Sequence, residues 1–350
     1  MVVVIGADVH KATHTLVAVD EVGKVVGQGV FPARREGHLR ALAWARRVCG
    51  AQVRWALEDC RHLTAGLERD LLGAGQQVVR VPPKLMGAAR RSGRERGKSD
   101  PIDALAVARA ALANPDLPVA RHDEASRAMK LLVDRREDLV AERTRMINRL
   151  RWHLHEIDPD LAPPAGALDR TVVVETLAAR LAGIDGLVAQ IAGEVLTDIA
   201  VRNTQITALE RRITALVRAE SPALLEVPGC GPLTAAKIVA ETAGIDRFAS
   251  EAAYAMFTGT APIPVWSGAT AGRVRLNRAG NRQLNAALHR IAITQVRLGG
   301  PGRAYYDHKR ADGKTSTESY RCLRRHLART IYNTLNHSRT AAAPPLAAAA

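Results

Sequence analysis

GKSDPIDALAVARAAL, residues 97–112, combines the start of a helix with two carboxylates. Pro101 fixes the backbone φ angle near the helical value and is favoured in a first helical turn, so a helix should begin here. The alanines and leucines that follow favour its continuation to Leu112. Asp100 and Asp103 are three residues apart, so their carboxylates should project from nearly the same side of that turn. Either Asp100 caps the helix and Asp103 interacts with the helix dipole, or both acids belong to a functional site.

Upstream of this helix, apolar runs and helical spacing alternate in a defined order. Strands are predicted over residues 2–7, 14–20, 24–31, 53–57 and 77–81, and helices over 37–48 and 63–72. Three strands, helix, strand, helix, strand and helix is the order of a ribonuclease-H-like, or RuvC-like, α/β domain. That fold is predicted for residues 1–120.

Four acids lie where a functional site would form in such a sheet. Asp8 ends the first strand and Glu58 ends the fourth, and functional groups of open α/β sheets gather at the carboxyl ends of strands. Asp100 and Asp103 open the helix that follows the last strand. Carboxylates in one pocket repel one another, so a divalent cation is the natural partner, and oxygen ligands favour Mg²⁺ or Mn²⁺. Asp59 is an alternative ligand, although strand alternation should point it to the other face.

The charge of the chain indicates a polyanionic partner. The formal net charge is +15 and the pI is near 10.4. Residues 267–339 contain thirteen arginines and two lysines against three acids, which accounts for +12 of the total. A smaller basic cluster precedes the paired aspartates and consists of Lys84, Arg90, Arg91, Arg94, Arg96 and Lys98. This concentration favours nucleic-acid binding over an ordinary solvated surface.

The four cysteines are far apart and form no Cys-x-x-Cys pair, which argues against a zinc site and against a disulfide framework. They suit a reducing cytosol. No apolar stretch approaches transmembrane length and no signal peptide is recognised, so no membrane partner is expected.

The middle of the chain, residues 121–218, is predicted to be a helical coiled-coil or oligomerisation region. Four apolar residues repeat every seven positions, namely Val133, Val140, Ile147 and Leu154. After a Pro/Gly break at 158–166, a second series alternates spacings of four and three: Val195, Ile199, Arg202, Ile206, Leu209, Ile213 and Leu216. Two such helices suit an antiparallel hairpin or a dimerisation arm, and a helical subdomain packed within one chain is the alternative.

Residues 219–340 are predicted to form a mostly α C-terminal domain with a helix-hairpin-helix. Segment 224–238, LLEVPGCGPLTAAKI, would place residues 228–231 in the tight turn and aim the next helix at a phosphate. Such elements hold the DNA backbone without reading bases. An ordinary turn between two helices is the alternative. The alanine-rich tail at 341–350 is predicted to be disordered.

Ser267 lies in a predicted loop before a helix at 282–297. A Ser-Gly pair in a loop is usually only a turn. Here four arginines follow the serine and suit a scissile phosphate: Arg273, Arg275, Arg278 and Arg282. Arg324 and Arg325 lie on a later basic helix that is predicted to face DNA. The same helix contains a pattern that resembles the active site of a tyrosine recombinase, namely His326, Arg329 and Tyr332. That chemistry needs the tyrosine on a separate element, so the segment is interpreted as a basic helix that faces DNA.

Four separated motifs occur in one order: GADVHK around Asp8, ALEDC around Glu58, GKSDPIDALAVAR around Asp100 and Asp103, and SG followed by RLNRAGNRQLNAALHRIA. Together they resemble the DEDD transposases of insertion sequences, the IS one-ten group, from residue 1 to about residue 336. The resemblance implies that Asp8, Glu58, Asp100 and Asp103 bind metal in a RuvC-like domain. It also implies that Ser267, in a transposase domain, becomes covalently joined to DNA.

The same resemblance implies partners that spacing and composition do not indicate. They are the DNA of the element ends and the target, a structured guide RNA encoded by the element, and further copies of the chain in a dimer or tetramer. The expected location is the bacterial cytoplasm, in association with the nucleoid.

The function predicted from the sequence is therefore an Mg²⁺-dependent transposase, a site-specific DNA recombinase with a serine nucleophile. One alternative is a RuvC-like structure-specific endonuclease that uses water, with Ser267 structural. The other is a non-catalytic nucleic-acid-binding protein. Metal-dependent strand breakage separates both enzymes from the binding protein, and a covalent protein–DNA adduct separates the recombinase from the endonuclease.

Overall fold

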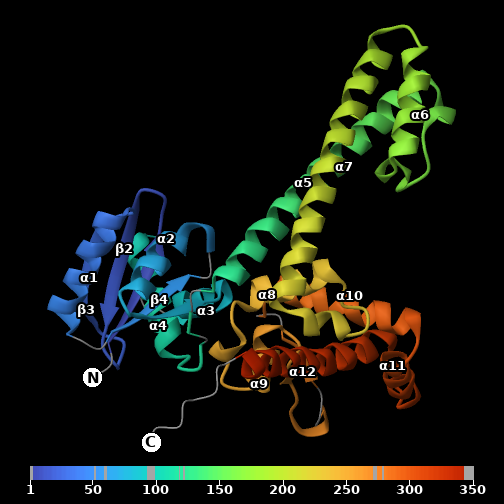
Figure 1. Cartoon of the computed structure of the whole chain (residues 1–350). Coiled ribbons are helices and arrows are strands. Elements are labelled where there is room, and N and C mark those ends of the chain that lie inside the picture. The colour runs from blue at the N-terminus through green and yellow to red at the C-terminus, as the bar shows by residue number, and fades with distance from the viewer. Residues whose placement is uncertain are drawn as a thin grey trace, which may run out of the picture. The chain divides into compact units, whose positions relative to one another are not determined.

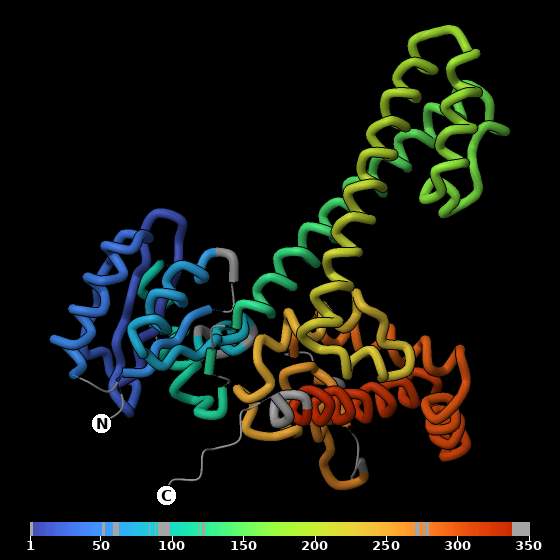
Figure 2. The backbone as a smooth tube through the Cα atoms, in the orientation of Figure 1, coloured from blue at the N-terminus to red at the C-terminus, as the bar shows by residue number. Residues whose placement is uncertain are grey.

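The computed structural model describes residues 3–50, 53–58, 61–92, 99–117, 119–120, 123–270, 274–277 and 280–342. The chain divides into two compact units, one formed by Met1–Glu124 with Glu241–Ala350 and the other by Ala125–Ala240. The elements are labelled in Figure 1, and Figure 2 traces the backbone through them. Among the described residues, no helix has both the length and the apolar character needed to cross a bilayer.

The N-terminal part of the first unit is built on a five-stranded mixed sheet with the order β3-β2-β1-β4-β5. Its strands are β1 (Val3–Val9), β2 (Thr13–Val19), β3 (Val25–Pro32), β4 (Val53–Glu58) and β5 (Gln77–Val81). The first three strands pair antiparallel, whereas β4 runs parallel to both β1 and β5. Every predicted strand is present within two residues of its predicted ends. The predicted α/β class of this domain is therefore confirmed.

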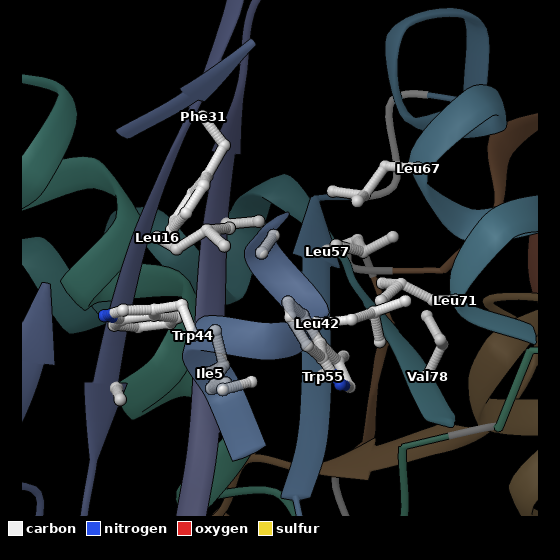
Figure 3. Close-up of a cluster of buried hydrophobic side chains, with 14 of the residues drawn as sticks. Ile5, Leu16, Phe31, Leu42, Trp44, Trp55, Leu57, Leu67, Leu71 and Val78 are labelled. Carbon is white, nitrogen blue, oxygen red and sulfur yellow. The ribbon is translucent and has the colours of Figure 1, made fainter. Parts of the chain in front are cut away.

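One face of the sheet is covered by α1 (Arg35–Cys49) and α2 (Arg61–Gly73). Strand residues two apart project to this face, and Ile5, Leu16 and Trp55 are fully buried there. Figure 3 shows these side chains with Trp44 of α1 and Leu71 of α2. This aliphatic and tryptophan core holds the sheet while leaving its other face for α3 (Pro83–Ser92) and α4 (Asp100–Leu112).

The contact between α4 and the sheet depends on a glycine of β1. A Cβ atom added at Gly6 would lie 2.1 Å from the carbonyl oxygen of Ala104 and 2.4 Å from the backbone nitrogen of Ala108. Only a residue without a side chain permits this approach of helix to strand. The alanines along α4 let the helix lie flat on β1 and β2. The close contact therefore determines where the first turn of α4 meets the sheet.

The second unit contains two helices of 34 residues, α5 (Glu124–Ile157) and α7 (Leu187–Glu220), with the shorter α6 (Thr171–Ala182) between them in sequence. Polar contacts join α5 to α7. The guanidinium of Arg136 donates to Glu210 at 2.7 Å, and that of Arg143 donates to Asn203 at 2.8 Å. A step of seven residues forward on α5 corresponds to seven residues backward on α7. The two helices therefore run antiparallel, as one of the predicted arrangements requires.

On α7, Ile199, Ile206 and Ile213 are buried, as predicted. Leu196 and Val217 are also buried, whereas the predicted Val195 and Leu216 beside them are half-buried. Between these positions the contacts with α5 are polar. The predicted Arg202 is half-buried and donates to Glu142 of α5 at 3.1 Å, and the half-buried Asn203 and Glu210 accept from arginines of α5. Self-association through this unit stays a prediction.

The predicted helix-hairpin-helix segment begins with a 3₁₀ helix (Pro222–Glu226) instead of an α-helix. A turn follows, in which the amide of Cys230 donates to the carbonyl of Val227 at 2.9 Å and Gly229 has φ +80°. Helix α8 (Pro232–Thr242) begins directly after the turn. Phosphate binding at this turn stays a prediction.

The C-terminal part of the chain is mostly helical, as predicted. Its elements are α9 (Glu251–Phe257), β6 (Pro262–Pro264), β7 (Val274–Leu276), α10 (Arg282–Leu298), α11 (Pro301–Ala311) and α12 (Ser316–Ala342). The last three helices pack on one another around fully buried Leu284, Leu288 and Leu323. Helix α12 includes the first two residues of the predicted tail, and residues 343–350 lie outside the described residues.

Candidate active site

The first two acids lie on neighbouring strands and on the same face of the sheet. Asp8 lies two residues after Gly6 in β1, so both project toward α4. Glu58 likewise lies two residues after Ala56 in β4 and is the last residue of that strand. The parallel register pairs Gly6 with Ala56, so Asp8 and Glu58 follow at equivalent positions toward the carboxyl ends. Asp59 lies outside the described residues.

The other two acids belong to the first turn of α4. Ser99 is the N-cap residue and makes no side-chain capping hydrogen bond, whereas Asp100 is the first helical residue. The interpretation of Asp100 as the helix cap was therefore wrong. Its side chain is 55% exposed, whereas Asp103 is buried. Since Gly6 holds α4 against β1, this first turn lies beside Asp8.

A histidine that was not predicted joins this site. The Nε2 atom of His10 lies 3.1 Å from Oδ2 of Asp8 and 3.4 Å from Oδ1 of Asp100. One ligand atom from each of the three residues lies within 4.8 Å of the others, a spacing that could hold a metal ion. His10 follows Asp8 by two residues, so strand alternation could have placed both side chains on one face.

The electrostatics of the site favour a cation. Burial raises the pKa of the Asp8 carboxyl, His10 opposes that shift, and the charges of Asp103 and Asp100 raise the pKa further. The carboxylates of Asp103 and Asp100 thus lie close enough to disfavour the ionised form of Asp8, and Glu58 lies on the adjacent strand. Carboxylate oxygens are the ligands that Mg²⁺ and Mn²⁺ accept, so the donor set fits a divalent cation.

Ser267 lies on a separate structure, the loop of a short hairpin. Strands β6 and β7 pair antiparallel, with Ile263 opposite Arg275. Ser267 is exposed between them and directly precedes Gly268, whose φ is +47°. Arg275 on β7 and Arg282 at the start of α10 are also exposed. Arg273 and Arg278 lie outside the described residues.

The asparagines after this hairpin anchor the chain that returns from it. The side chain of Asn277 donates to the carbonyl of Met256 at 2.9 Å. Asn281 caps α10 by accepting from the amides of residues 283 and 284, and it donates to Glu241 at 2.7 Å. A Cβ atom at Gly280 would lie 2.1 Å from the nitrogen of Gly259. Much of the RLNRAGNRQLN motif therefore fixes the position of the serine hairpin.

The two arginines predicted on α12 both have protein partners. Arg324 donates to Oδ1 of Asn285 at 2.7 Å, and burial, followed by the charge of Arg321, lowers the pKa of its guanidinium. Arg325 forms an ion pair with Glu251 at 2.5 Å. These two contacts position α12 against α10 and α9. Contact of either guanidinium with DNA stays a prediction.

The mixed sheet has carboxylates gathered beside its central strand, and the strongly basic character of the chain suits a protein that binds nucleic acid. Comparison with known families specifies which of these proteins the chain is similar to. Residues 5–159 match a transposase family described as DEDD transposase IS110, and residues 221–307 match one described as transposase IS116/IS110/IS902 family. The chain belongs to the IS110/IS116 family of insertion-sequence transposases, whose activity is DNA cleavage and strand transfer.

Similar proteins include products of three insertion elements. The IS900 protein of Mycobacterium paratuberculosis is 28% identical over 91% of this chain and 92% of its own length. The IS116 protein of Streptomyces clavuligerus is 28% identical over 98% of this chain and 97% of its own length. The transposase of IS1111A from Coxiella burnetii is 24% identical over 81% of this chain and 75% of its own length. The solved structure of T. thermophilus RuvC with a Holliday junction substrate is 16% identical, covers 33% of this chain and 95% of that chain, and has a TM-score of 0.26.

Proposed function

We propose that this transposase cuts and exchanges DNA strands with a divalent cation at Asp8, Glu58, Asp100 and Asp103 and with Ser267 as the nucleophile. The observation that carries the proposal is the convergence of three of these carboxylates, with the pKa of Asp8 raised by burial and by its acidic neighbours. Carboxylates gathered in this way repel one another, and a bound divalent cation would offset that repulsion.

The residues of the chain have distinct roles in this reaction. Asp8 and Asp103 would hold the cation in the buried part of the site, and Asp100 would complete it from the exposed side. The imidazole of His10 would keep the Asp8 and Asp100 carboxylates in place. When bound, Mg²⁺ or Mn²⁺ would help to remove the proton of the attacking hydroxyl and would stabilise the leaving oxygen.

The serine step conserves the energy of the phosphodiester bond. The Oγ atom of Ser267 forms a bond to phosphorus while a phosphorus–oxygen bond of the DNA strand breaks, and the released strand end takes up a proton. The exposed guanidinium groups of Arg275 and Arg282 would offset charge on the phosphate oxygens. The reaction requires the acidic site and Ser267 to meet, either within one chain or between copies of the chain.

Cation binding at the acidic site can be tested through protein stability. The pKa of Asp8 is raised in the folded state, so its contribution to stability is present at low pH and is lost as pH rises through that pKa. Without metal at pH 7, Asp8→Asn should therefore melt at or above the temperature of the wild type. Mg²⁺ or Mn²⁺ at about 100 times its Kd should stabilise the wild type by about 2.7 kcal/mol. The cation should stabilise Asp8→Asn much less, as measured by calorimetry.

A matched control is Asp20→Asn, the same substitution in the turn after β2, where the carboxylate accepts from the amides of Val22 and Lys24. This variant should keep the full effect of the cation. Equal stabilisation of Asp8→Asn and wild type by the cation would show that the acidic site does not bind it.

The nucleic-acid partners belong to the same proposal. Family membership supports the DNA of the element ends and target, and the net charge of +15 supports a polyanion. We propose an element-encoded guide RNA, a homo-oligomeric assembly and phosphate contacts at the turn before α8. Sequencing of RNA that co-purifies with the protein should recover one structured transcript from beside the gene. Recovery of only bulk cellular RNA would count against the guide.

A further inference from the structure

The C-terminal helical region contains a cationic pocket of which the proposed reaction uses only Arg275. Its volume is about 320 Å³. The walls are the base of the β6–β7 hairpin, one face of α12, Tyr305 of α11 and Lys314 in the loop before α12. All these elements lie within one compact unit.

The charge of this pocket suits an anion. Five lining residues are cations: Arg275, Lys314, Arg321, Arg325 and Arg329. The three α12 arginines follow one another at intervals of four, so they project from one face of the helix. Of the described residues that line the pocket, one is acidic. That residue, Glu318, accepts from the amide and the hydroxyl of Thr315 at 2.9 and 2.8 Å at the start of α12.

Contacts behind and beside the pocket hold its walls in place. Glu251 of α9 binds Arg325 at 2.5 Å and Arg329 at 2.9 Å. The rings of Tyr305 and His326 stack with their centroids 5.3 Å apart and an interplanar angle of 18°. A wall that is already ordered loses little conformational freedom when a ligand binds.

The pocket also has apolar lining residues and more room than a lone phosphate requires. Its volume lies at the lower end of the roughly 300–1,000 Å³ typical of small-molecule pockets. Pro262, Val274 and Cys322 also line it. We propose that it holds one nucleotide of a nucleic-acid strand, with the phosphate on Arg321 and Lys314 and the sugar and base against the apolar lining residues.

This inference rests on the proposed function, because the same hairpin carries Ser267. Pro262 precedes the serine by five residues, a reach of at most roughly 18 Å for an extended chain. A DNA strand rises about 3.4 Å per nucleotide, so the bound nucleotide would lie within about five nucleotides of the scissile phosphate. Its capture would set which phosphate reaches Ser267.

The free thiol of Cys322 reports occupancy directly, since it lines the pocket and is half-buried. The rate of its alkylation by iodoacetamide can be followed by peptide mass spectrometry in the full chain. Single-stranded DNA at roughly ten times its Kd leaves about a tenth of the sites free, so alkylation should slow about tenfold. Parallel arms contain single-stranded RNA of the same sequence, deoxyadenosine monophosphate and inorganic phosphate. Cys49, in the N-terminal domain, is the internal reference.

The double variant Arg321→Gln with Lys314→Gln should lose this protection and should lower the salt slope of single-strand binding by about 0.7 for each phosphate contact removed. Arg297→Gln removes one exposed charge in the last turn of α10, outside the pocket, and should keep the protection. The relative effects of the DNA and RNA arms identify the strand that the pocket holds.

Unchanged Cys322 alkylation while fluorescence anisotropy shows DNA bound would overturn the inference, whether or not the variants fold. Equal protection by phosphate and by the mononucleotide would reduce the pocket to an anion site and would also overturn it. If a covalent adduct at Ser267 forms without protection of Cys322, the inferred nucleotide site is wrong and the proposed function stands. If protection occurs without any adduct, the nucleotide site stands and the serine mechanism is wrong.

Discussion

Ser267→Ala should abolish the covalent protein–DNA product while DNA binding stays close to that of the wild type. Ser267 is exposed in the loop between β6 and β7, and the asparagines after the hairpin help to hold it in place. Removal of one hydroxyl should therefore leave the fold intact. The loss of adduct should be complete, because a methyl group cannot form a bond to phosphorus.

The measurement is a reaction on labelled DNA that is denatured and separated by electrophoresis, in which label that migrates with the protein reports the adduct. Ser316→Ala is a matched control, because it removes a hydroxyl that accepts from Tyr306 at 2.9 Å in the same C-terminal region. That variant should still form the adduct. A wild type that cuts DNA without any adduct, and an equally active Ser267→Ala, would support the water-using endonuclease instead.

Asp100→Asn should lower strand cleavage by about a thousandfold or more, while the folded protein remains nearly as stable as the wild type. A bound cation contributes several kcal/mol to the transition state, and each 1.36 kcal/mol is tenfold in rate, so loss of about 4 kcal/mol has this effect. The structural cost should be small. Asp100 is the first residue of α4, its side chain is 55% exposed, and the helix is not capped by it.

Glu36→Gln is the control for Asp100→Asn. It distinguishes the loss of a metal ligand from the loss of a favourable charge at the N-terminus of a helix. Glu36 is the acid in the first turn of α1, and its side chain is 71% exposed. Loss of either charge should cost roughly 0.3–1 kcal/mol through the dipole. Only the α4 variant should lose cleavage, measured with metal present on a labelled strand. Full activity of Asp100→Asn would remove this residue from the cation site.

The order of elements in the N-terminal domain could be predicted from local patterns. A β-branched run such as 2–7 favours a strand whatever it packs against, and Pro101 after Ser99-Asp100 favours a helix start in the same way. The four acids could be nominated because they stand at the ends of such elements. Their convergence could not be deduced from spacing, since Asp8 and Asp100 are brought together only by the packing of α4 on β1.

Two features depend on a neighbouring segment that local patterns do not include. The contacts of α7 with α5 include the half-buried Asn203 and Glu210, which accept from arginines on α5. A pattern of apolar residues cannot reveal a polar residue whose partner lies on another helix. The alternative in which Asp100 caps its helix was wrong, since its carboxylate lies near His10 and Ser99 is the N-cap residue.

By itself, the sequence determined the α/β class of the N-terminal domain, its strand order along the chain, the helical character of the rest, and a basic, DNA-acting family. These properties follow from short-range periodicity, charge and motifs, which do not require knowledge of long-range contacts. The tertiary structure alone decided the close approach of α4 at Gly6, the place of His10 beside Asp8, and the cationic pocket at the base of the serine hairpin. Each of these depends on which backbones can approach and which side chains then meet, and those contacts exist only in the folded chain.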